Sequence, residues 1–214
     1  ELENNSTKKK PEKKYQNINK KNYHLITSEK EIDEWIKEAE EAGELAIDTE
    51  TSSLDAHQAD LVGISLSTKI GKACYIPIGH KFKGCLKKEA VINKLKPLLE
   101  DKSVKKVGQN IKFDFIVLFK LGINMNSMED TMLMSYVLDA GKNRHNMDTL
   151  SEIHLQHKTI SFKEIVGTGK KEINFSDVEL DKALEYAAED ADITYRLYKL
   201  FSKSLKLEKL NNIY

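Results

Sequence analysis

Two carboxylates stand close together near the start of the chain. Asp48 and Glu50 lie two residues apart, directly after the apolar run at 45–47. Because side chains alternate along a β-strand, a strand here places both carboxylates on one face. The apolar residues before them indicate a buried strand, where two like charges are costly without a cation. Alone, an Asp-x-Glu pair after a strand is common, and its default meaning is a turn.

Two further polar pairs occur at helical spacing. Asn110 and Asp114 are four residues apart, as are Tyr186 and Asp190, so each pair shares a face if its segment is helical. The apolar neighbours of Asp114 make that acid more suggestive than one on a surface. Two alternatives remain open: Asn110 could cap its helix, and the acidic run at 189–192 could be a solvated stretch.

The four carboxylates are more informative as a set than singly. Carboxylate oxygens are the hard ligands that Mg²⁺ and Mn²⁺ prefer. Two such ions can stabilise both the attacking and the leaving oxygen of an in-line phosphoryl displacement. A tyrosine beside them can orient the attacking water. The set therefore predicts a metal-dependent phosphoryl-transfer site, provided that the fold brings the four acids together.

The hydrophobic pattern predicts the elements that must position these acids. Ser28 and Glu31 form a capping box before a helix that ends at Gly43, and Ser176 and Glu179 form a second one before a long helix towards residue 205. We expect strands at 23–26, 45–50, 61–67, 73–78 and 104–108, and further helices after Gly84 and at 111–121, 129–138 and 147–157. Strands come first and helices later, which predicts an α/β fold with a mixed sheet flanked by helices.

Length and composition bound the domain organisation. The 214 residues suffice for one domain with an appendage. Residues 1–21 carry seven lysines against three glutamates and few apolar side chains, so we expect a disordered basic arm or linker followed by one domain at 22–214. The remainder has a net charge of −4, which disfavours nucleic acid unless cations hold its carboxylates.

Several function classes are disfavoured. No apolar run approaches the roughly 18 residues of a membrane span, and the charged first residues are unlike a secretory signal. The two cysteines fit a reducing compartment such as the cytoplasm. The run at 167–170 lacks the glycine and Ser/Thr positions of a phosphate-binding loop. His154 and His157 indicate an exposed helix face rather than zinc.

Taken in order, the three pairs resemble the motifs of the DEDD-type 3′→5′ exonucleases that carry tyrosine in the third motif. The surrounding runs resemble more specifically the proofreading exonuclease domain of bacterial DNA polymerase I, over about residues 22–205. These runs are Asp48-Thr-Glu-Thr-Ser-Ser-Leu-Asp55, Gly108-Gln-Asn-Ile-Lys-Phe-Asp114, Met147-Asp-Thr-Leu150, His157-Lys-Thr-Ile-Ser-Phe162 and Tyr186-Ala-Ala-Glu-Asp-Ala-Asp-Ile-Thr194.

The resemblance implies an RNase H-like fold with a five-stranded mixed sheet. It implies two divalent ions, Mg²⁺ or Mn²⁺, with Asp48 bridging both, Glu50 and Asp190 completing the first site and Asp114 holding the second. Tyr186 would position the attacking water.

The resemblance also implies a substrate site. Leu54 and Phe162 would wedge and stack against the terminal bases, and Phe113 stands where some relatives have tyrosine. Residues near the 3′ end and its phosphates would be Thr51, Gln109, Asn110 and Arg144. Because stacking is largely blind to base identity, we expect little sequence preference and a preference for frayed or single-stranded ends.

The implied activity is removal of 3′-terminal nucleotides from DNA as nucleoside 5′-monophosphates. The implied partners are a single-stranded or frayed DNA 3′ end and a polymerase domain of the same parent chain, with a monomer as the default. Two alternatives stay open: a ribonuclease D-like 3′→5′ exoribonuclease, and a non-catalytic end-binding module that stabilises the polymerase.

Overall fold

The structure, a computed structural model, describes residues 18–214. Most of the arm predicted at 1–21 therefore lies outside the described residues. Within the described part of that arm, Ile18 packs against an apolar cluster and Lys20 forms an ion pair with Glu189. None of the described helices is long and apolar enough to cross a membrane.

A six-stranded mixed sheet forms the centre of the molecule, in the order β1-β4-β3-β2-β5-β6. The strands are β1 (Asn22–Leu25), β2 (Glu44–Thr51), β3 (Leu61–Lys69), β4 (Lys72–Pro77), β5 (Lys105–Gly108) and β6 (Met128–Asp130). The central strands β2, β3 and β4 pair antiparallel, whereas β1, β5 and β6 join in parallel. Five strands were expected from the sequence. The sixth, β6, has three residues, which is too few to show a hydrophobic period.

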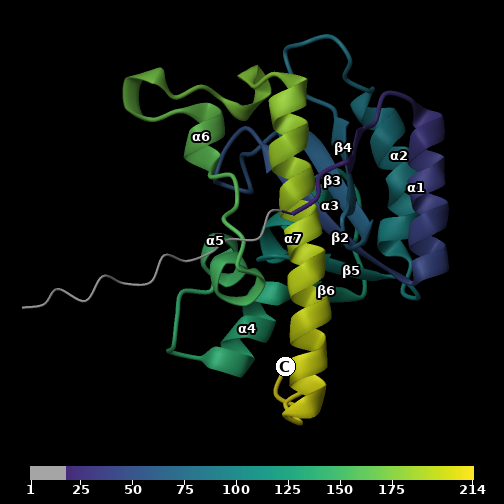
Figure 1. Ribbon diagram of the computed structural model, residues 1–214. Helices are drawn as coiled ribbons and strands as arrows, with labels where there is room; N and C mark the ends of the chain where they lie inside the picture. The colour runs from purple at the N-terminus through teal and green to yellow at the C-terminus, as the bar shows by residue number, and fades with distance from the viewer. Residues whose placement is uncertain (1–17) are drawn as a thin grey trace, which may run out of the picture.

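Helices cover both faces of the sheet (Figure 1). One apolar cluster joins the sheet to α1 (Glu29–Ala42), α2 (Lys88–Glu100) and α3 (Lys112–Lys120). The opposite face is covered by α7 (Leu180–Leu207), against which α4 (Thr131–Asp139), α5 (Met147–Leu150) and α6 (Phe162–Val166) pack. The α/β fold with a helix-flanked mixed sheet is thus confirmed.

The alternation along β2 decides which side of the sheet carries the acids. Leu45 and Ile47 belong to the cluster with α1 and α2, whereas Ala46 belongs to the cluster with α7. Asp48 and Glu50 share the parity of Ala46 and therefore point to the α7 side.

The long helix α7 lies close to the sheet because the side chains on its inward face are small. Ala183, Ala187, Ala188 and Ala191 are all completely buried, and the helix packs against β2, β3 and β4. This close approach brings Asp190 to the end of β2.

Two predicted helix boundaries differ from the structure. The first helix, α1, agrees with the prediction: the capping box at Ser28 begins it and the left-handed Gly43 ends it. Ser176, however, lies in a 3₁₀ turn (Phe175–Asp177), and α7 begins only at Leu180 because the backbone between them is extended. The predicted helix at 147–157 is α5 followed by a π-helical turn (Ser151–Leu155) that ends at Gln156 in the left-handed conformation.

Candidate active site

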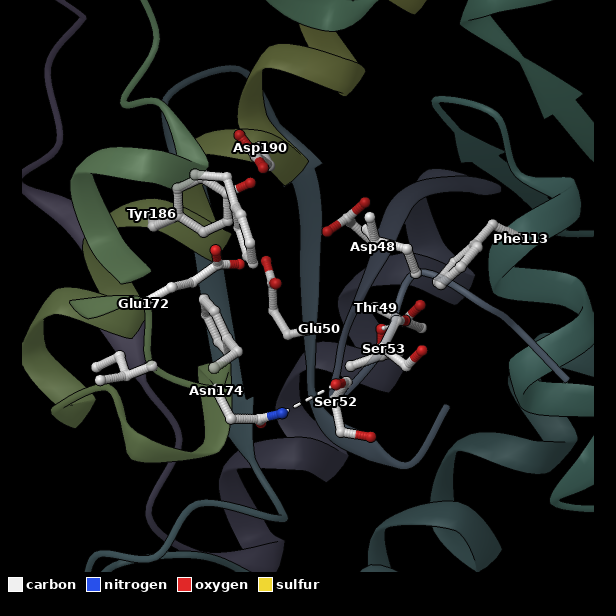
Figure 2. Close-up of a pocket in the computed structure, with 15 residues that line it drawn as sticks. Asp48, Thr49, Glu50, Ser52, Ser53, Phe113, Glu172, Asn174, Tyr186 and Asp190 are labelled. Atoms are coloured by element: carbon white, nitrogen blue, oxygen red, sulfur yellow. Dashed lines mark hydrogen bonds between the residues drawn. The ribbon is translucent and has the colours of Figure 1, made fainter. Parts of the chain in front are cut away.

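Three of the predicted carboxylates meet in one place. Asp48 and Glu50 come from the end of β2 and Asp190 from α7, and one oxygen of each lies within 4.8 Å of the others. Figure 2 shows the three side chains converging on one cavity. Residues separated by about 140 positions along the chain are brought together here because α7 crosses the end of β2.

The fourth carboxylate, Asp114, is held beside this group by the strand itself. The Thr49 backbone N–H and hydroxyl both donate to Asp114 Oδ1, at 2.9 and 2.6 Å. Thr49 lies between Asp48 and Glu50, so these bonds fix α3 against the strand end. Sequence reasoning missed Thr49, because a threonine inside a strand gives no separate signal.

Burial and mutual repulsion keep protons on these acids. Burial, reinforced by Asp114, raises the pKa of Glu50 to about 8. Burial also raises the pKa of Asp114 to about 7, although the two Thr49 bonds oppose it. The pKa values of Asp48 and Asp190 also lie well above the usual range, because of burial and the neighbouring carboxylates. A cation among them would favour the ionised forms.

The donor set fits a divalent metal ion. Glu50 Oε1 is buried and has no hydrogen-bond partner among the described residues, which is costly for an oxygen of this kind. It belongs to the trio of converging acids, and such hard oxygens suit Mg²⁺ or Mn²⁺. The unsatisfied oxygen is therefore explained if a cation binds here.

Tyr186 lies one turn before Asp190 on α7 and lines the same cavity. Burial raises the pKa of Tyr186, and the neighbouring Asp190 carboxylate adds to this effect. The hydroxyl therefore stays protonated near neutral pH. Its ring lies 6.0 Å from that of Phe162 and 5.9 Å from that of Phe175, measured between centroids.

The cavity has a volume of about 550 Å³. Thr51, Leu54 and Phe113 contribute to its wall, as does Phe162 from the start of α6. Leu54 is 92% exposed and Phe162 40% exposed, so both offer apolar surface to a ligand. A cavity of this volume is large enough for a small-molecule ligand.

One wall comes from a loop that sequence reasoning did not single out. Glu172, Ile173, Asn174 and Phe175 line the cavity opposite the β2–β3 loop. The Asn174 side-chain amide donates to the Ser52 carbonyl oxygen at 2.9 Å, which joins the two walls (Figure 2). A loop without hydrophobic period gave no sign of this contact.

Three residues predicted near the substrate do not line the cavity. Gln109 uses its amide internally: Nε2 donates to the His145 carbonyl and Oε1 accepts from Thr131. Arg144 is exposed. Asn110 precedes α3 with a positive φ of 60°, so the predicted shared helix face with Asp114 is wrong, as is the alternative of a side-chain cap.

Two minor interpretations are also corrected. The acidic run at 189–192 is not a solvated stretch, because Glu189, Asp190 and Asp192 are all buried. His157 is buried as well rather than part of an exposed helix face, and its Nε2 lies 2.9 Å from Glu189 Oε1.

Comparisons with known proteins agree with this geometry. A family model of the polymerase A exonuclease domain, described as 3′-5′ exonuclease, matches residues 23–206. A DNA polymerase I of Rhizobium leguminosarum is 44% identical over 86% of the chain, and one of Pseudomonas aeruginosa is 43% identical over 86%. These matches cover 20% and 21% of the two relatives, so the chain spans about a fifth of their length.

Solved structures share the fold. The structure of Brucella melitensis NrnC with bound Mg²⁺ is 25% identical with a TM-score of 0.61, covering 79% of this chain and 77% of that one. The Aedes aegypti Nibbler EXO domain has a TM-score of 0.68 at 14% identity, covering 90% of this chain and 93% of that one. The second likeness bears on the fold alone, and it agrees with the RNase H-like architecture expected from the sequence.

Proposed function

Since the chain belongs to the 3′-5′ exonuclease domain family of DNA polymerase I, we propose that it removes 3′-terminal nucleotides from DNA and releases nucleoside 5′-monophosphates. The reaction is hydrolysis of the last phosphodiester bond. The observation that carries the proposal is the meeting of Asp48, Glu50 and Asp190, with the buried Glu50 Oε1 left unpartnered among the described residues.

We assign the carboxylates to two metal sites. Asp48, Glu50 and Asp190 would hold one Mg²⁺ or Mn²⁺, and Asp48 and Asp114 would hold the second. When bound, the ions supply positive charge for the attacking and leaving oxygens of the phosphodiester. This charge would also offset the repulsion between the net-acidic domain and DNA, because it places positive charge beside the DNA phosphate.

The chain's own residues orient the reactants. Because the Tyr186 hydroxyl keeps its proton, it can donate to an oxygen beside it, and its own oxygen can accept from the attacking water. Leu54 and Phe162 would separate and stack the terminal bases, with Thr51 and Phe113 along the wall. Gln109, Asn110 and Arg144 remain predicted contacts to the DNA strand outside the cavity.

The domain would act within a longer polymerase, where it would remove mispaired 3′ ends. This rests on the curated relatives, of which the chain spans about a fifth. An unpaired terminus costs less to separate than a paired one, which is the physical basis for proofreading.

The test uses 5′-labelled single-stranded DNA with Mg²⁺. We expect Asp190→Asn to lower kcat at least about 100-fold, because it removes a charged ligand without changing the shape of the side chain. Glu185→Gln, the same kind of change at an exposed site on α7, should leave kcat unchanged.

Full activity in Asp190→Asn with a normal melting curve would refute the assigned role. Cleavage of RNA but not DNA by the wild type would favour the exoribonuclease alternative. DNA binding without any cleavage would favour the non-catalytic module.

A further inference from the structure

Glu189 is a buried acid that the proposed chemistry does not use. It directly precedes Asp190 on α7 and is completely buried. A buried carboxylate is stable only where hydrogen bonds or ion pairs satisfy it. Its partners therefore show what this part of the fold is built to hold.

All three of the hydrogen-bond and ion-pair partners identified for Glu189 lie outside α7. Oε1 is 2.9 Å from His157 Nε2 and 2.9 Å from Lys20 Nζ, while Oε2 accepts from the Ile160 backbone N–H at 2.6 Å. One side chain thus fastens two parts of the chain to the helix that carries Asp190: the segment at 157–160 and Lys20, which lies two residues before β1.

The fastened segment leads directly to Phe162. Only Ser161 separates Ile160 from Phe162, and Ser161 is itself fixed, because its N–H and hydroxyl donate to Glu164 Oε2 at 2.7 and 2.9 Å. Phe162 is the first residue of α6 and lines the cavity, with its ring 6.0 Å from Tyr186.

Residues 157–160 also form hydrogen bonds to Ser151 and Asp148 in the preceding turns, but neither of these bonds reaches α7. Helix α6 has five residues, and a helix this short depends on tertiary contacts. Phe162 is also 40% exposed, so packing against its ring only partly fixes its place. The bonds to Glu189 are therefore the main polar contacts that tie this segment to α7.

We propose that Glu189 is a positioning residue: by holding residues 157–160 against α7, it sets the place of Phe162 relative to Tyr186 and Asp190, and so controls stacking of the 3′-terminal base. The inference rests on the proposed function, since it concerns the same site. It adds a residue that touches neither metal nor DNA and acts through Phe162.

The test is a double-mutant cycle between Glu189 and Phe162. The substrate is a single-stranded oligonucleotide ending in 2-aminopurine, whose fluorescence reports stacking. Glu189→Gln keeps the shape of the side chain but removes its charge and presents an amide to donors. We expect it to raise KM about fivefold or more with kcat changed less than about twofold, because a displaced Phe162 weakens base stacking in binding.

The coupling separates positioning from a general structural role. In a Phe162→Ala background, Glu189→Gln should change KM less than about twofold, because the residue through which it acts is gone. Glu185→Gln should change KM in neither background. Effects of Glu189→Gln and Phe162→Ala that simply multiply would overturn the proposal.

Two further measurements keep the test decisive. If Glu189→Gln does not fold, the cycle is run with His157→Gln, which leaves the carboxylate and its bond to Ile160 in place; a multiplicative effect there overturns the proposal equally. Fluorescence of the terminal 2-aminopurine on binding in EDTA needs no hydrolysis. Reduced stacking in Glu189→Gln supports the inference even if the wild type proves inactive, in which case only the proposed function fails.

Discussion

Glu50 shows how a single side chain can reveal the chemistry of a site. Its carboxylate is buried beside two other acids, and one of its oxygens has no partner among the described residues. A protein core rarely keeps such an oxygen unsatisfied unless a ligand uses it. The same atom, Glu50 Oε1, is therefore both the unsatisfied oxygen that destabilises the metal-free protein and a proposed metal ligand.

The raised pKa of Glu50 gives a prediction about stability and pH. Its folded-state pKa of about 8 exceeds the value of about 4.3 in an unfolded chain, so between these values the folded state holds a proton that the unfolded state has released. Stability from this group is complete below about pH 4 and is lost as pH rises through about 8.

We therefore expect the stability of metal-free Glu50→Gln relative to wild type to increase by about 3 to 4 kcal/mol between pH 5 and pH 8. Urea unfolding in EDTA measures this. The difference between the two proteins cancels the opposite contribution of His80 and His154, whose pKa values are lowered by burial. Mn²⁺ at pH 8 should shift the difference in favour of wild type, and a constant difference across this range in EDTA would contradict the assignment.

At the residue scale, the spacing of the acids was informative because strand and helix periods are fixed. The strand period correctly placed Asp48 and Glu50 on one face of β2, and the fold then brings Asp190 to the same place. Thr49 and Asn174 could not be predicted, because their roles depend on which segments lie opposite them in space. Asn110 was misplaced because its left-handed backbone belongs to the turn between β5 and α3, not to the helix.

At the scale of elements, two capping boxes of the same chemistry allow a matched comparison. Ser28 and Glu31 begin α1, and Ser161 and Glu164 begin α6, with the serine and glutamate bonded in both. The first helix packs far from the cavity, whereas α6 begins with Phe162, which lines it. The same substitution should therefore have different consequences.

Ser28→Ala should lower the free energy of unfolding by about 1 kcal/mol and leave KM for single-stranded DNA unchanged. Ser161→Ala should raise KM several-fold, because it releases the start of the helix that carries Phe162. Chemical denaturation of both variants measures the free energy of unfolding, and steady-state kinetics measures KM. Equal effects on KM would show that the cap of α6 does not act on the site.

The capping boxes predicted at Ser28 and Ser176 show when a local motif identifies the start of a helix. The box at Ser28 was predicted correctly because an amphipathic helix follows it at once. The box expected at Ser176 was wrong, because Asn174 caps a 3₁₀ turn there instead and the chain runs extended to Leu180. A capping motif identifies a helix start only when the next turn continues the helix.

For the whole molecule, the order of strands and helices predicted the architecture but not every edge. The mixed sheet with helices on both faces follows from hydrophobic periods that all agree. The strand β6 was missed because its three residues are defined by pairing with β5 rather than by their own pattern. The cavity depends on this architecture, since α7 must cross the end of β2.

We expect folding to assemble a site for two divalent ions, and a crystal of the wild-type chain soaked in Mn²⁺ would show whether it does. An anomalous difference map should show two peaks, one among Asp48, Glu50 and Asp190 and one between Asp48 and Asp114. The same soak of Asp190→Asn should lose or weaken the first peak. A map with no peak at these carboxylates, while Mn²⁺ binds elsewhere, would contradict the account.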